Sequence, residues 1–278
     1  MRVSLWGTRG SLPTAGPDTA RYGGNTACVE IRGDDGTLLV LDAGTGIRPL
    51  GAALEETPSR IDILLTHLHM DHIQGLGFFQ PLFETGLEVH IWGPTSGKLD
   101  LRARLTRYLS PPLFPVPLRD LPSDVTFHEV LSSDFRIGSL NITADHVCHP
   151  GPTFGYRIQE GSASVAYLPD HEPALGLDVF TPTNGWMSGF DLAADVDLLI
   201  HDAQYTPEEY ERHVGWGHSS IAHCAAFATA ARAKHLVLFH HDPSHDDASL
   251  DVCAEQAARF SNAEVEVTVG SEGAVFQL

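Results

Sequence analysis

The chain has 278 residues, 42% of them hydrophobic and 19% charged, which suits one hydrophobic core and a single domain over residues 1–278. Its 17 Lys and Arg residues against 36 Asp and Glu give a formal charge of −19, which repels polyanions and makes long nucleic acid an unfavourable partner. No run reaches the roughly 18 apolar residues of a membrane span, and the N-terminus lacks the apolar run of a signal peptide, so we expect no membrane association and a cytoplasmic location.

The first quarter of the chain alternates short apolar runs with glycine-rich turns. Short runs rich in Val, Leu and Ile predict strands over residues 2–6, 26–32, 37–42 and 61–66. The glycines between the first two runs allow backbone conformations closed to other residues and indicate a loop. Residues 47–55 have helical spacing. The strand over 61–66 runs directly into a cluster of histidines.

The remainder of the chain interleaves further strands and helices. Leucine spacing predicts a helix over residues 99–109, which cannot continue through the proline-rich loop 110–117. Further strands are expected over residues 135–144, 153–159, 164–168, 198–201, 235–239 and 264–269. Further helices are expected over residues 207–213, 220–232 and 248–260. Without an internal repeat or a charged linker, the pattern favours a layered α/β sandwich, with two sheets face to face and helices outside.

Four candidate metal ligands follow the strand that ends at residue 66. These are His67, His69, Asp71 and His72, and imidazole and carboxylate are donors that zinc takes. In an extended chain that enters a turn, His67 and His69 face the same way and can share one metal. Asp71 and His72 then fall on the turn, beside a second metal. The spacing therefore predicts two adjacent metal ions.

Three later β-rich segments each end at a candidate donor, namely His149, Asp170 and His240. The pattern HxHxDH, followed by a lone His, a lone Asp and a final His, resembles the metallo-β-lactamase superfamily. The resemblance implies a four-layer αββα sandwich and two Zn²⁺ ions, with Mn²⁺ or Fe as alternatives. It assigns one zinc to His67, His69 and His149, the other to Asp71, His72 and His240, and the bridging position to Asp170.

Neighbouring histidines leave the last ligand position open. His241 directly follows His240 and could replace it, and we prefer His240 because it ends the strand cleanly. His146 and His171 adjoin other proposed ligands. We expect these two to orient ligands by hydrogen bonding, or to lie at the surface, rather than to bind metal.

Two adjacent cations activate a bridging water to hydroxide near neutral pH and stabilise an oxyanion, so hydrolysis is the expected reaction. The segments around Asp202 and His218 resemble the phosphodiesterase branch of the superfamily, which includes the ribonuclease that trims transfer-RNA 3′ ends and the cyclic phosphodiesterase of phosphonate breakdown. The resemblance implies that Asp202 and His218 protonate the leaving oxygen, a task suited to an imidazole steered by a carboxylate. With Asp71 they form the expected catalytic set. The alternative is that Ser219 caps the next helix and His218 merely precedes it.

The expected substrate is a small phosphodiester, such as a cyclic nucleotide or a cyclic sugar phosphate, because the chain has no long basic insertion to grip RNA. Thr8, Arg9 and Tyr205 are candidate substrate contacts, although Arg9 could equally be a solvated arginine in a glycine-rich turn. Four aromatic residues in loops could line a pocket for a base or sugar, or could simply pack in the protein. They are Phe114 in the proline-rich loop and Phe180, Trp186 and Phe190 in an insertion over residues 173–191.

Two other functions remain open at this point. A lactonase or β-lactamase of the same fold would attack a carbonyl and would leave Asp202 and His218 without a role. A non-catalytic metal- or ligand-sensing module is the other, and the complete ligand pattern speaks against it. A homodimer is left open. The four cysteines are scattered without a CxxC pair and indicate reduced thiols.

Overall fold

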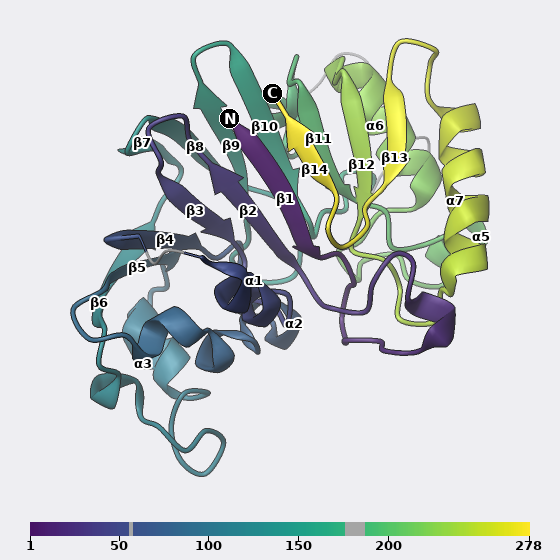
Figure 1. The fold of residues 1–278 in the computed structure, drawn as a ribbon. Coiled ribbons are helices and arrows are strands. Elements are labelled where there is room, and N and C mark those ends of the chain that lie inside the picture. The colour runs from purple at the N-terminus through teal and green to yellow at the C-terminus, as the bar shows by residue number, and fades with distance from the viewer. Residues whose placement is uncertain (56–57, 176–186) are drawn as a thin grey trace.

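Two seven-stranded sheets face one another in the computed structural model, which describes residues 1–55, 58–175 and 187–278 (Figure 1). The first sheet has the spatial order β14 (Val275–Gln277), β1 (Arg2–Gly7), β2 (Cys28–Arg32), β3 (Leu38–Leu41), β4 (Arg60–Leu64), β5 (Glu88–Pro94) and β6 (Asp124–Val130). The second has the order β13 (Glu266–Val269), β12 (His235–Phe239), β11 (Leu198–Asp202), β10 (Ala163–Leu168), β9 (Phe154–Glu160), β8 (Leu140–His146) and β7 (Ser133–Ile137). The two termini meet where β14 pairs with β1.

Helices cover the outer face of each sheet. Those on the first sheet are α1 (Ile47–Ala53), α2 (Met70–Ile73) and α3 (Leu101–Thr106), with short 3₁₀ turns at Leu76–Phe78, Gln80–Phe83 and Leu118–Asp120. Those on the second sheet are α4 (Phe190–Ala193), α6 (Ile221–Ala231) and α7 (Asp247–Phe260). A further 3₁₀ turn at Pro17–Thr19 and the short α5 (Pro207–Tyr210) lie in connections.

Three buried apolar clusters separate these layers. One lies between the sheets and joins residues such as Val29 of β2 to Ile158 of β9. The others lie beneath the helices of the first sheet and beneath those of the second. The order helix, sheet, sheet, helix confirms the αββα sandwich that the sequence predicts.

Strand direction places the chemistry at one edge of the molecule. Strands β3 to β6 run parallel to one another, as do β10 to β13, so their carboxyl ends meet at common edges. Two hydrogen bonds fasten the sheets together there: the Tyr156 hydroxyl donates to the Leu65 carbonyl at 2.8 Å, and the Phe154 amide donates to the Thr66 carbonyl at 2.9 Å. The start of the histidine-rich run is thereby fixed against the opposite sheet.

Several expected elements differ from those observed. The single strand expected over residues 135–144 is the hairpin β7–β8, which turns at Gly138 with φ +53°. The helix expected over 99–109 is the shorter α3, which begins after Asp100 because that side chain accepts a hydrogen bond from the Ala103 amide. Strands β5, β6 and β14 lie outside the expected set. No helix in the described ranges is long and apolar enough to cross a bilayer, and all four cysteines are free thiols.

Candidate metal centre

The histidine-rich run changes from extended to helical backbone partway along its length. His67 is buried directly after β4, and His69, which is exposed, keeps an extended conformation at the N-terminus of α2. The short α2 then turns Asp71 and His72 into the protein, where both are buried. The change of conformation divides the four donors into two pairs, as the spacing predicts.

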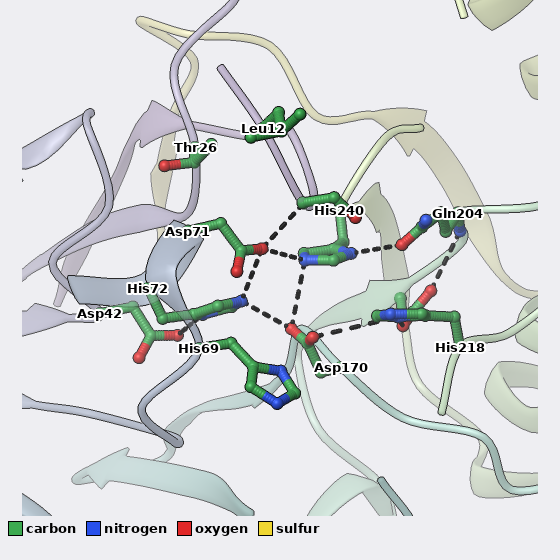
Figure 2. Close-up of polar contacts among 12 residues, drawn as sticks. Leu12, Thr26, Asp42, His69, Asp71, His72, Asp170, Gln204, His218 and His240 are labelled. Carbon is green, nitrogen blue, oxygen red and sulfur yellow. Dashed lines mark hydrogen bonds and ion pairs between the residues drawn. The ribbon is translucent and has the colours of Figure 1, made fainter. Parts of the chain in front are cut away.

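Later strand ends complete two adjacent groups of donors. Figure 2 shows four of these donors, Asp71, His72, Asp170 and His240, facing one another. The structure brings all seven expected ligands together: within each group the donor atoms lie within 4.8 Å of one another, in the sets His67, His69, His149 and Asp170, and Asp71, His72 and His240. His149 follows β8, Asp170 follows β10 and His240 follows β12. The centre therefore depends on both sheets.

Asp170 lies between the two groups. Its Oδ1 is 3.0 Å from His72 Nε2 and 3.4 Å from His240 Nε2, and its Oδ2 is 3.7 Å from both His67 Nε2 and His149 Nε2. Burial opposes the charged form of this carboxyl, but His240, His72 and His67 outweigh it and hold the pKa well below its usual value. The carboxylate is thus ionised and faces both sets of donors.

Three ligand atoms of the cluster are buried and make no hydrogen bond within the described residues, namely His67 Nε2, His72 Nε2 and Asp170 Oδ1, although the last two lie 3.0 Å apart. Buried polar atoms in folded proteins are nearly always satisfied, and atoms that converge on one space can be satisfied together by a cation. Burial, followed by the neighbouring His72, lowers the pKa of His67 well below its usual value, so His67 is the neutral imidazole that binds metal. The cluster therefore fits divalent metal.

Three of the candidate ligand imidazoles are oriented by a polar contact at Nδ1, the ring nitrogen that does not face the cluster. His72 Nδ1 lies 2.8 Å from Asp42, His240 Nδ1 lies 2.9 Å from Gln204 Oε1, and His149 Nδ1 lies 2.8 Å from the Gly217 carbonyl oxygen. These contacts fix which nitrogen faces the cluster.

Asp42, at the end of β3, was not among the expected site residues. Besides His72, its carboxylate accepts hydrogen bonds from the Thr66 amide at 2.8 Å and from the Tyr167 hydroxyl at 3.0 Å. Its backbone has φ +59°, a left-handed conformation that carries strain outside glycine. The only sequence signal was an acidic residue at a strand end, before the short glycine-rich turn over 43–46.

The structure distinguishes between the two adjacent histidines after β12. His240 Nε2 lies 3.1 Å from Asp71 Oδ2, whereas the His241 ring points elsewhere and its Nε2 lies 2.8 Å from the Gly270 carbonyl oxygen. Burial lowers the pKa of His241 to about 3, so it donates that bond as a neutral imidazole. The loop before β2 approaches so closely that a Cβ at Gly10 would be 2.4 Å from His240 Nδ1.

His218 lies beside Asp170 of the cluster (Figure 2). Its Nδ1 lies 2.7 Å from Asp202 Oδ2. Asp202 Oδ1 is fixed in turn by the amides of Gln204 and Ser219, at 3.0 and 3.2 Å. Burial opposes protonation of His218, but the Asp202 carboxylate outweighs it and raises the His218 pKa to about 9. Ser220, rather than Ser219, caps α6, because its side chain accepts from the His223 amide. The capping alternative for Ser219 is therefore wrong.

A buried carboxylate that sequence reasoning missed holds the His218 loop in place. Glu172 accepts hydrogen bonds from the Gly215 amide at 2.8 Å, from the Gly217 amide at 2.7 Å and from the Tyr210 hydroxyl at 2.9 Å. The Gly217 carbonyl orients His149, and the next residue is His218. One carboxylate thus supports both a candidate ligand and the candidate acid.

The expected substrate contacts lie inside the protein. Arg9 is 0% exposed, and its guanidinium donates to the carbonyls of Gly23 at 2.8 Å and His245 at 2.6 Å. It ties the N-terminal loop to the segment after β12, so neither a phosphate contact nor a solvated arginine fits this geometry. Thr8 and Tyr205 are buried as well, and the Tyr205 ring stacks on His213.

The other histidines and the loop aromatics singled out in the sequence lie outside the donor cluster where the structure describes them. His171 is buried with its Nδ1 2.9 Å from His201 Nε2, and His146 is exposed. Phe114 is buried in the core beneath the first sheet's helices, and Phe190 packs against the core of the second sheet. Phe180 and Trp186 lie outside the described residues.

Comparisons with known proteins agree with this architecture. The sequence profile of a family described as "Beta-lactamase superfamily domain" matches residues 37–241. A ribonuclease Z from Myxococcus xanthus is 26% identical over 280 aligned residues, covering 88% of this chain and 88% of that protein. The metallo-beta-lactamase fold protein YhfI from Bacillus subtilis has a TM-score of 0.72 at 19% identity, covering 99% of this chain and 98% of that one. A new diphosphatase from the PhnP family has a TM-score of 0.68 at 20% identity, covering 100% and 97%.

The support that Asp42 gives to His72 predicts weaker metal binding when its charge is removed. We expect Asp42→Asn to lower zinc affinity by about ten- to a hundredfold, because the ligand loses the carboxylate that orients it. Competition against a chromophoric chelator measures the change. The matched control is Asp62→Asn, which alters a buried carboxylate bonded to Arg60 and Trp92 within the first sheet. A folded Asp42→Asn protein that keeps the parental affinity would contradict this role.

Proposed function

Because this chain belongs to the beta-lactamase superfamily, we propose that it is a dinuclear zinc phosphodiesterase that cleaves a small phosphodiester, such as a cyclic nucleotide or a cyclic sugar phosphate. The family match and the donor cluster make it a metal-dependent hydrolase. The proposal of a phosphodiesterase rests on the Asp202–His218 pair, which lies beside the cluster. The hydrogen bond to Asp202 orients the His218 ring, which bears the proton.

The donor set favours zinc. Five imidazoles and two carboxylates offer the nitrogen and oxygen ligands that zinc prefers, with Mn²⁺ and Fe as alternatives for such a set. His67, His69 and His149 would hold one ion, Asp71, His72 and His240 the other, and Asp170 would serve both. When bound, a pair of ions supplies an activated water and stabilises charge that develops on a phosphoryl oxygen.

The chain's own contribution is proton delivery. Because Nδ1 of His218 is bonded to Asp202, the proton on Nε2 is the one that His218 would donate to the oxygen that leaves phosphorus. The raised pKa keeps His218 protonated at neutral pH, and nearby cations would draw that pKa down toward the working range of a general acid. Alkoxide leaving groups need such an acid, whereas the opening of an activated carbonyl does not need one in this position.

Charge supports a small substrate. The chain carries −19 overall, which opposes the binding of a long polyanion. The likeness to a ribonuclease Z favours RNA as the second candidate substrate. We also propose a cytoplasmic location for the protein, and a homodimer remains open.

A substrate panel tests the proposal. We expect the zinc-loaded protein to hydrolyse bis-p-nitrophenyl phosphate and at least one cyclic mononucleotide, to lose both activities when a chelator removes the metal, and to regain them when zinc returns. Lactones and a structured RNA complete the panel. Lactones that open while phosphodiesters remain intact would overturn the proposal in favour of a carbon-centre hydrolase. Cleavage of the RNA alone would make the protein a ribonuclease.

The role of His218 predicts a loss that depends on the leaving group. We expect His218→Asn to lower kcat for a cyclic nucleotide, whose leaving oxygen needs a proton, by about 10²–10⁴-fold. The loss for bis-p-nitrophenyl phosphate should be much smaller, because nitrophenolate leaves as an anion. The control is His146→Asn, at an exposed histidine outside the donor cluster. Equal losses on both substrates would contradict a general-acid role.

A further inference from the structure

A cleft shares a wall with the candidate metal centre. It has a volume of about 600 Å³ and is lined by Leu68, Met70, Ile73, Arg104, Arg107, Tyr108 and Leu113. Leu68 and Met70 flank the exposed candidate ligand His69, and Ile73 follows His72. Along the sequence, these cleft residues therefore alternate with the candidate metal ligands. Its volume lies within the range of about 300–1,000 Å³ that is typical of small-molecule sites.

The apolar lining of this cleft is open to water. Met70 is 52% exposed and Leu113, from the proline-rich loop, is 71% exposed. The neighbouring Phe78, which packs edge-on against Phe114, is 60% exposed. Large apolar side chains gathered beside a reactive centre indicate a surface that a ligand covers.

The charge at this cleft is opposite to that of the rest of the molecule. Residues 98–119 carry five of the chain's 17 Lys and Arg residues but only one of its 36 acids, Asp100, and two of these cations, Arg104 and Arg107, line the cleft, whose lining includes no acid. Arg104 is held by the Pro94 carbonyl and lies 3.5 Å from Glu129. Arg107, which caps the C-terminus of α3, is exposed and has no carboxylate at ion-pair distance within the described ranges. The cleft therefore combines apolar side chains with two arginines, in a chain whose formal net charge is −19.

We propose that this cleft holds the part of the substrate beyond the scissile phosphodiester, namely an aromatic or apolar group that carries a second phosphate, with Arg107 bound to that phosphate. The planar fork of donors on an arginine guanidinium matches phosphate geometry. The apolar group covers Met70 and Leu113, while the scissile phosphodiester lies at the metal centre. This inference rests on the proposed function, and it narrows the substrate to one with two separated phosphates.

Two substrates that differ by one phosphate test this assignment. Thymidine 5′-(p-nitrophenyl phosphate) and its 3′-phosphorylated derivative share base, sugar and leaving group. We expect the parent protein to favour the 3′-phosphorylated compound in kcat/KM. In Arg107→Ala this preference should fall by about ten- to a hundredfold, the range for a hydrogen bond to a charged group, mainly through KM. The control is Arg102→Ala on the same helix, which lines a different cleft with Pro117 and Arg119 and should keep the preference.

A binding measurement separates failure of this assignment from failure of the proposed function. Calorimetry with thymidine 3′,5′-bisphosphate, in the presence and absence of zinc, should show weaker binding to Arg107→Ala than to the parent or to Arg102→Ala. If no p-nitrophenyl ester is hydrolysed but this difference is seen, the phosphodiesterase proposal fails and the cleft assignment stands. If bis-p-nitrophenyl phosphate is hydrolysed but the parent shows no preference for the second phosphate, or Arg107→Ala retains it, the assignment is overturned. Equal loss in Arg102→Ala would also overturn it.

Discussion

The cost of burying charge is the constraint on which this site depends. Asp170 is held in the interior as a carboxylate with five imidazoles within 3.9 Å, and the Asp71 carboxylate lies beside it. Unpaired buried charges and unsatisfied buried donors are costly, so such a group persists only where its members compensate one another or share a cation. In this site the histidines surround the buried carboxylates and compensate their charge.

The fold supplies this arrangement through strand direction. Residues far apart in sequence arrive together because the strands that precede them end at common edges, and because bonds from β9 hold the end of β4 against the second sheet. A second set of groups then orients the first: Asp42 and Gln204 fix candidate ligands, while Asp202 fixes the candidate acid. Glu172 connects the two functions, since the loop that it holds carries both the acceptor for His149 and His218 itself. The left-handed backbone of Asp42 and His240 is consistent with strain accepted at a working site.

How much of this was predictable depends on whether the signal was local. The run from His67 to His72 could be recognised because its spacing and the preceding strand lie within a few residues. His149, Asp170 and His240 were expected from strand ends in a familiar order. Asp42, Gln204 and Glu172 orient other residues through contacts between distant segments, so their neighbours in sequence give little sign of their roles, and for Asp42 the one local signal was its place at a strand end. Arg9 shows the converse: an arginine in a glycine-rich loop reads as exposed, yet backbone carbonyls from two other segments bury it. The hairpin at Gly138 was missed because an apolar run on both sides of one glycine reads as a single strand.

A crystal structure of the zinc-loaded protein, with anomalous scattering recorded on both sides of the zinc edge, would show directly whether this cluster holds two metal ions. We expect two zinc peaks per chain, one bounded by His67, His69 and His149 and the other by Asp71, His72 and His240, with Asp170 between them. A fully loaded crystal with no peak in this cluster, or with His149 and His240 turned away from the bound ions, would contradict this expectation.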